Sequence, residues 1–140
     1  HSVKLWSSTQ RTIALSSGEA EYIALVKGAS IGLGIVSMLR DFNISVDNRI
    51  HIGTDSTAAK GIACRRGLGK IRHLDVSKLW IQDKVLTGEI IVRKVPGESN
   101  ISDGLTKYLD NSKLLFHLSS TGQLVMQGRH SLMPCITSDQ

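Results

Sequence analysis

Residues 16–25 read SSGEAEYIAL, and the architecture of the chain can be worked out from this stretch. Ser16 followed three residues later by Glu19 is a capping-box pattern, in which the serine hydroxyl accepts a hydrogen bond from a backbone amide of the first helical turn. A helix is therefore predicted to begin here. Downstream, apolar side chains recur at steps of three and four and form one continuous helical stripe. The stripe comprises Tyr22, Leu25, Val26, Ala29, Leu33, Val36 and Leu39.

Three glycines lie inside this predicted helix, at Gly28, Gly32 and Gly34. Each of them weakens a helix by about 1 kcal/mol relative to alanine. Close packing against a sheet is one reason for a helix to tolerate them, because a glycine lets a neighbouring group approach the helix backbone. The glycines therefore fit a helix that packs against a sheet.

The segments on both sides of this helix are predicted to form short strands and further helices. Alternating and β-branched residues predict strands over residues 3–7, 49–55 and 89–95, with another extended piece at 12–15. Helical patterns cover residues 56–64, 74–86 and 102–109, and Gly67 and Gly69 separate the first two. This order of elements predicts an α/β layer fold. We assign it to a domain of residues 1–110, followed by a weakly packed or disordered tail over 111–140.

The composition excludes several classes of protein. The chain has 140 residues, 41% hydrophobic and 21% charged, which fits one globular domain. No apolar run approaches the ~18 residues of a membrane span, so no membrane partner is expected. Two cysteines, Cys64 and Cys135, are too few for a disulfide framework or a cysteine-rich zinc site, which predicts a reduced, intracellular setting. No leader segment opens the chain, and because it does not begin with Met, we expect His1 to be the cut edge of a longer protein.

The charge distribution predicts a polyanionic partner. The formal net charge is +5, and residues 56–74 contain no acidic side chain. The basic side chains of this stretch are Lys60, Arg65, Arg66, Lys70 and Arg72, followed by His73. We call residues 60–73 the basic segment and predict that it contacts phosphates. The alternative is a solvated loop.

Three carboxylates fall at positions where chemistry is often found. Glu21 lies one turn into the first long helix, Asp55 ends the second strand, and Asp103 opens the last helix. Sheets of α/β proteins present ligands at the carboxyl ends of their strands. Carboxylates without a Cys or His cluster suit Mg²⁺ or Mn²⁺, and two such ions can align a water and a leaving oxygen at a phosphodiester. The alternatives are that Asp55 and Asp103 are helix caps and that Glu21 is a solvated helix residue.

Several stretches also match known motifs in the expected order. Residues 15–25 match the pattern LSS-x-EAEY-x-AL, and residues 101–107 match ADxLTK. Weaker matches are residues 6–12 to WSSKKQRT, residues 54–59 to DN-x-x-A and residues 72–76 to KHID. Together these stretches resemble the RNase H domain of copia-type retrotransposon polyproteins over about residues 5–109.

The resemblance implies a fold, an activity and a set of partners. The fold would be RNase H-like, with a mixed five-stranded sheet flanked by helices. The activity would be two-metal cleavage of the RNA strand of an RNA/DNA hybrid during reverse transcription. By position, Glu21, Asp55 and Asp103 would ligate two Mg²⁺ or Mn²⁺ ions, and the basic segment would grip the hybrid. The partners would be the hybrid and the reverse transcriptase portion of the same polyprotein, in the cytoplasm within a virus-like particle if the element is active.

The chain departs from the family pattern in two respects. The first catalytic aspartate of the family lies on a strand upstream of the WSS motif, so this chain carries three of the four expected ligands and lacks the first strands of the sheet. We therefore expect the isolated chain to be unstable or inactive, because its sheet edge would be exposed. The loop at residues 97–100 also lacks the histidine of some RNases H, which leaves Glu98 or His73 as the candidate proton carrier.

Three other interpretations remain open. The chain could be a catalytically inactive, nucleic-acid-binding remnant of an RNase H domain, as the missing aspartate favours. It could be an integrase-like relative, although the last acid of the ligand set in such proteins is a glutamate, whereas here it is Asp103. It could also be a plain α/β protein in which the carboxylates only cap helices, and such caps would not bind Mn²⁺.

Overall fold

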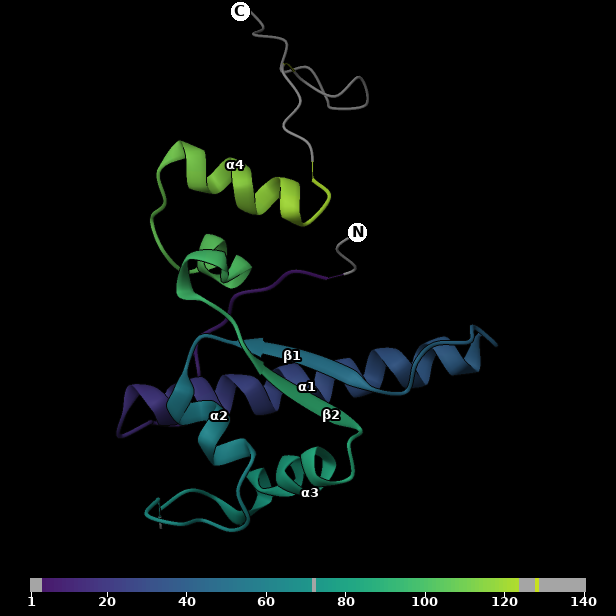
Figure 1. The fold of residues 1–140 in the computed structure, drawn as a ribbon, viewed down its shortest axis with the longest axis vertical. Coiled ribbons are helices and arrows are strands. Elements are labelled where there is room, and N and C mark those ends of the chain that lie inside the picture. Colours follow the sequence, from purple (N-terminus) through teal and green to yellow (C-terminus); the bar gives the residue numbers. More distant parts are fainter. Residues whose placement is uncertain (1–3, 72, 124–127, 129–140) are drawn as a thin grey trace, which may run out of the picture. The chain divides into compact units, whose positions relative to one another are not determined.

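The computed structural model describes residues 4–71, 73–123 and 128, and these form two compact units. One unit is Ser8–Asn100, and the other combines His1–Ser7 with Ile101–Gln140. The elements of the first unit are α1 (Ser17–Asp41), β1 (Ile50–Thr54), α2 (Thr57–Ala63), η1 (Val76–Lys78), α3 (Trp80–Leu86), β2 (Ile90–Lys94) and η2 (Gly97–Ser99) (Figure 1). The second unit holds η3 (Ile101–Leu105) and α4 (Asn111–Ser120). The η elements are 3₁₀ helices.

The start of α1 confirms the capping pattern. Ser16 is the N-cap, and its hydroxyl accepts a hydrogen bond from the Glu19 amide at 3.2 Å. The Glu19 carboxylate in turn accepts from the amide of Leu15 at 2.9 Å. In a capping box the carboxylate bonds to the amide of the cap residue itself, so here it reaches one residue further back. These bonds determine how the chain enters the helix.

The sheet consists of two parallel strands. β1 pairs with β2 in a register that runs from Ile50 opposite Ile90 to Thr54 opposite Lys94. Parallel strands need a long crossover, which α2 and α3 provide here. In Figure 1 the two strands run side by side across α1. The predicted α/β class is confirmed in the form of a small two-stranded parallel sheet with helices.

Two predicted strands are wrong. Residues 4–15 form no strand, although an alternating pattern at 3–7 and an extended piece at 12–15 were expected. Residue 3 lies outside the described residues. An alternating pattern makes a strand only where another strand provides hydrogen-bonding partners, and a short isolated segment has none. β1 and β2 therefore form the sheet of the described residues by themselves.

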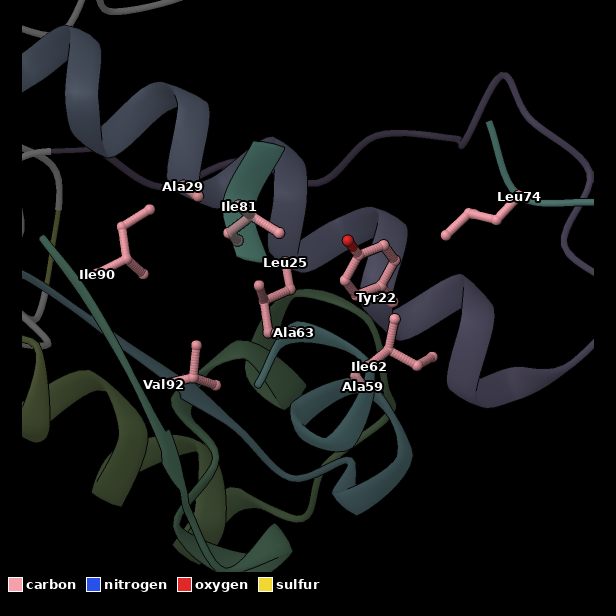
Figure 2. Packing of buried hydrophobic residues seen from close by; sticks show 10 residues of the cluster. All are labelled: Tyr22, Leu25, Ala29, Ala59, Ile62, Ala63, Leu74, Ile81, Ile90 and Val92. Carbon is pink, nitrogen blue, oxygen red and sulfur yellow. The ribbon is translucent and has the colours of Figure 1, made fainter. Parts of the chain in front are cut away.

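The hydrophobic core lies between α1, the sheet and the crossover helices (Figure 2). Its buried members are Tyr22, Leu25, Ala29, Ala59, Ile62, Ala63, Leu74, Ile81, Ile90 and Val92. Within the predicted α1 stripe, Tyr22, Leu25 and Ala29 are buried, whereas the other members are only partly covered: Val26, Leu33, Val36 and Leu39. The Tyr22 hydroxyl donates to the carbonyl of Lys78 at 2.8 Å, and burial raises the pKa of Tyr22 to about 12. The buried tyrosine thus retains a partner for its polar end.

By length and composition, α1 could cross a membrane. This corrects the expectation that no apolar run reaches that length. Core helices pass the same test, and α1 places Tyr22, Leu25 and Ala29 in the core.

The helices of the second half differ from those predicted. The helix expected over 74–86 is divided into η1 and α3, because the Asp75 side chain accepts from the Ser77 amide at 2.9 Å and starts a separate turn. Asp103 does not open a helix over 102–109. It lies inside η3, which ends at Leu105. Residues 111–120, expected within the tail, form α4, whose N-cap is Asp110. The rest of that tail, apart from residues 121–123 and 128, lies outside the described residues.

Close packing explains only some of the glycines in α1. A Cβ atom at Gly32 would lie 3.3 Å from the Ile50 side chain, in line with helix-to-sheet packing. Gly28 and Gly34 have no such neighbour within 4 Å. The closest approach is at Gly18, where a Cβ atom would lie 2.6 Å from the Cβ of Ala58. Gly18 therefore allows the first turns of α1 and α2 to touch.

Two alanine substitutions should have opposite effects on stability. Gly18→Ala is expected to destabilise the protein by about 1–3 kcal/mol, because the added methyl group forces α1 and α2 apart. Gly28→Ala is expected to stabilise it by about 0.4–1 kcal/mol, because the site is open and alanine favours the helix. Urea unfolding of both variants measures the difference. Equal changes in the same direction would contradict this packing.

Candidate functional site

Asp55 lies at the carboxyl edge of the sheet. It follows β1 directly and is half-buried, and its backbone carbonyl accepts a hydrogen bond from Lys94 Nζ. The N-cap of α2 is Ser56, whose hydroxyl accepts from the Ala59 amide at 3.1 Å. Capping is therefore not the role of Asp55, and that alternative is wrong. A Cβ atom at Gly97 would lie 4.0 Å from Asp55 Oδ2, so the chain leaving β2 passes beside this carboxylate.

Glu21 is an exposed residue of α1, in the same unit as Asp55. It lies about one turn along from Gly18, the residue that touches Ala58 at the start of α2. Ala58 in turn follows Asp55 by three residues. The first turns of α1 and the end of β1 thus belong to one packed region, which carries two of the three predicted carboxylates.

Asp103 belongs to the other compact unit. Its side chain is mostly covered and accepts a hydrogen bond from Lys107 Nζ at 2.9 Å, one helical turn later. Asp103 is not a helix N-cap, so this alternative is wrong as well. The ion pair between Asp103 and Lys107 therefore joins η3 to the residues that directly follow it.

The three carboxylates have the right chemistry for Mg²⁺ or Mn²⁺. Among the described residues, no three Asp, Glu, His or Cys side chains form a group that could hold a metal ion. Glu21 and Asp55 lie on packed elements of one unit, and Asp103 lies in the other.

Residues 65–69 of the basic segment form a defined bend. Gly67 and Gly69 have positive φ angles of 75° and 57°, which L side chains rarely adopt. The Arg65 guanidinium folds back over this bend and donates to the carbonyl of Leu68. A Cβ atom at Gly69 would lie only 2.7 Å from this guanidinium. Arg65 is therefore a structural part of the bend.

The other basic side chains differ in exposure. Arg66 within the bend and Lys70 directly after it are exposed, and Lys60 on α2 is half-buried. Arg72 lies outside the described residues. Arg66 and Lys70 are thus the cations that the bend offers most openly to a polyanion.

Gln82 is a polar residue of this region that the sequence analysis missed. It is only 6% exposed, and its Oε1 accepts from the Gly67 amide at 2.8 Å. Its Nε2 donates to the carbonyls of Gly67 at 3.1 Å and Ile62 at 2.9 Å. The signal in the sequence is a glutamine directly after the apolar run Leu79-Trp80-Ile81, where a helix faces the core.

His73 connects the basic segment to the start of α1. Its Nε2 lies 2.9 Å from Glu19 Oε2, and the Glu19 side chain is only 3% exposed. The hydrogen bond with His73, followed by that from the Leu15 amide, lowers the pKa of the Glu19 carboxyl below its ordinary value of 4.5. Burial acts in the opposite direction but is weaker. Of the two candidate proton carriers, His73 thus has one ring nitrogen engaged with Glu19. The other candidate, Glu98, is an exposed residue of η2.

No family model matches the chain, and no solved structure matches it. The resemblance to RNase H domains therefore depends on the sequence motifs.

Glu19 should make stability depend on pH. Its lowered pKa means that it stabilises the folded chain above about pH 4.5 and that this contribution is lost as the pH falls through the lowered value. Glu19→Gln is expected to cost about 1–3 kcal/mol at neutral pH and progressively less in acid. Unfolding free energies between pH 7 and pH 3 measure this, with Glu98→Gln as an exposed control. A difference that does not change with pH would contradict the role of the Glu19 carboxylate.

Proposed function

We propose that this chain is the RNase H-type nuclease domain of a retrotransposon polyprotein, which hydrolyses the RNA strand of an RNA/DNA hybrid during reverse transcription. The observation that carries the proposal is the position of Asp55 at the carboxyl edge of a parallel sheet, in the same unit as Glu21 and the basic segment. The motif matches over residues 15–25 and 101–107 support the same assignment. In this proposal the fold is RNase H-like, and the two parallel strands are part of a larger sheet.

The three carboxylates are assigned to cation binding. Glu21, Asp55 and Asp103 are assigned to bind Mg²⁺ or Mn²⁺, together with the aspartate that the resemblance places upstream of Trp6. Bound cations would supply an activated water and neutralise charge at the phosphate.

The basic segment is assigned to hold the hybrid. Exposed cations bind phosphates without reading sequence, which suits an enzyme that must act along a whole transcript. Discrimination of the hybrid would come from the width of its minor groove and from its 2′-hydroxyl groups. The reverse transcriptase portion of the polyprotein would be the covalent partner, and the compartment would be the cytoplasm.

A second candidate function is binding of nucleic acid without cleavage. It is favoured by the way the basic segment is built, because every described contact that holds it comes from within Ser8–Asn100. Hybrid binding would then need neither Asp103 nor an upstream aspartate. The two candidates share the binding surface and differ in the carboxylates.

Cleavage of an end-labelled RNA/DNA hybrid with Mn²⁺ tests the enzyme proposal. We expect Asp55→Asn to lower the cleavage rate roughly 100-fold or more, because it removes a charged cation ligand. Asp83→Asn, a change of the same type at an exposed position on α3, should leave the rate unchanged.

A version extended upstream through the missing strand separates the two candidates. Cleavage by the extended version alone would mean that the upstream aspartate is required. Hybrid binding without cleavage by either version would favour the second candidate. Equal cleavage by wild type and Asp55→Asn would refute the assignment of Asp55.

Salt dependence distinguishes the exposed cations from Arg65. The double variant Arg66→Gln, Lys70→Gln is expected to reduce the slope of log affinity against log salt by about 2, since each phosphate contact contributes about 0.9. Arg65→Gln should instead lower the melting temperature, because its guanidinium holds the bend. Fluorescence anisotropy of hybrid binding at several salt concentrations measures the slope, and a thermal melt of Arg65→Gln measures the melting temperature. An unchanged slope in the double variant would exclude these two residues from phosphate contact.

A further inference from the structure

Gln82 has the features of a side chain that organises a binding loop. Glutamine is seldom buried, because its amide carries two donors and an acceptor that all need partners. Gln82 is 6% exposed and makes three hydrogen bonds, all to backbone groups. None of these groups belongs to its own helix, α3. The buried amide therefore binds the backbone at the end of α2 and in the segment that follows it.

The three bonds satisfy backbone groups that have no partner of their own in regular structure. The carbonyl of Ile62 lies in the last turn of α2, where carbonyls have no backbone N–H donor within the helix. Gly67 both donates to Gln82 Oε1 and accepts from Gln82 Nε2, much as two residues pair in a β-ladder. The amide thereby holds Gly67 in its left-handed conformation, with φ at 75°.

The exposed cations Arg66 and Lys70 lie within three residues of Gly67 in the sequence. Arg66 precedes Gly67 directly, and Lys70 follows three residues later. Arg65 closes the bend from the other side through its bond to the Leu68 carbonyl. The backbone that carries Arg66 and Lys70 is thus held at Gly67 and at Leu68, while their side chains reach solvent.

We infer that Gln82 is a positioning residue for polyanion binding. It holds the bend at residues 65–69 in one conformation, so that Arg66 and Lys70 meet phosphates without the entropic cost of ordering the loop. Gln82 itself touches no ligand and acts through the backbone of Gly67. This inference rests on the proposed binding of an RNA/DNA hybrid.

The variant Gln82→Met tests the inference, because methionine has a similar length but no hydrogen-bonding amide. Binding of the full chain to a fluorescein-labelled RNA/DNA hybrid is measured over a range of salt concentrations. Affinity is expected to fall about tenfold at every salt concentration. The slope against log salt should stay the same, since the cations remain present. Loss of Arg66 and Lys70 would instead reduce the slope.

A double-mutant cycle shows whether Gln82 acts through these cations. In the Arg66→Gln, Lys70→Gln background, Gln82→Met should have no further effect on affinity. A merely structural role would lower affinity by the same factor in both backgrounds. Ile81→Val is the matched control, since Ile81 is the fully buried neighbour on α3. It should lower the melting temperature and leave hybrid affinity unchanged.

A second pair of variants addresses the bend without altering the core. Gly67→Asn is expected to retain affinity, because asparagine tolerates a positive φ, whereas Gly67→Val should weaken binding as Gln82→Met does. If Gln82→Met does not fold, this pair decides the question. If the wild type binds the hybrid and both Gln82→Met and Gly67→Val bind it with unchanged affinity, the inference about Gln82 is overturned while the proposed function stands. No hybrid binding by the wild type would overturn the proposed function and the inference with it.

Discussion

The packing of α1 against the parallel pair of β1 and β2 is the interaction on which the first unit depends. Parallel strands need a long crossover and apolar cover, since no tight turn can join them. α1 supplies this cover through Tyr22, Leu25 and Ala29, and Gly18 brings the start of α2 into contact. Because β1 and α2 both pack on α1, the helix also determines where Glu21 and Asp55 lie relative to the sheet edge.

Buried polar side chains then hold the connections between these elements. Tyr22 bonds to the backbone at Lys78, Gln82 bonds to Gly67, and Glu19 bonds to His73. All three contacts fall on the crossover between α2 and α3, where the chain has little regular structure. In a low-dielectric interior such bonds are costly to break, because the released group loses its partner without regaining water. The basic segment therefore belongs to the packed structure of the unit.

The sequence predicted the features that depend on near neighbours. The Ser16 cap and the extent of α2 are determined within a few residues, and the structure confirms them. The strands expected over residues 49–55 and 89–95 are also confirmed, because each of them pairs with the other. The strands expected at 3–7 and 12–15 failed because a strand needs a partner, which no local pattern can report. The role of Gln82 was missed for a similar reason, since its contacts join residues 15 or more positions apart. For the carboxylates, the chain order placed Glu21 and Asp55 on packed elements, but it could not reveal that Asp103 belongs to another unit.

The register of the sheet has a consequence for how the chain folds. Ile50 pairs with Ile90, so the strands meet only after about 40 residues of chain have been closed into a loop. The helices and their caps form from local contacts and can be complete much earlier. Long-range pairing of this kind slows folding, so strand pairing is expected to be the late step. During that interval the unpaired backbone of the two strands is exposed, which favours aggregation.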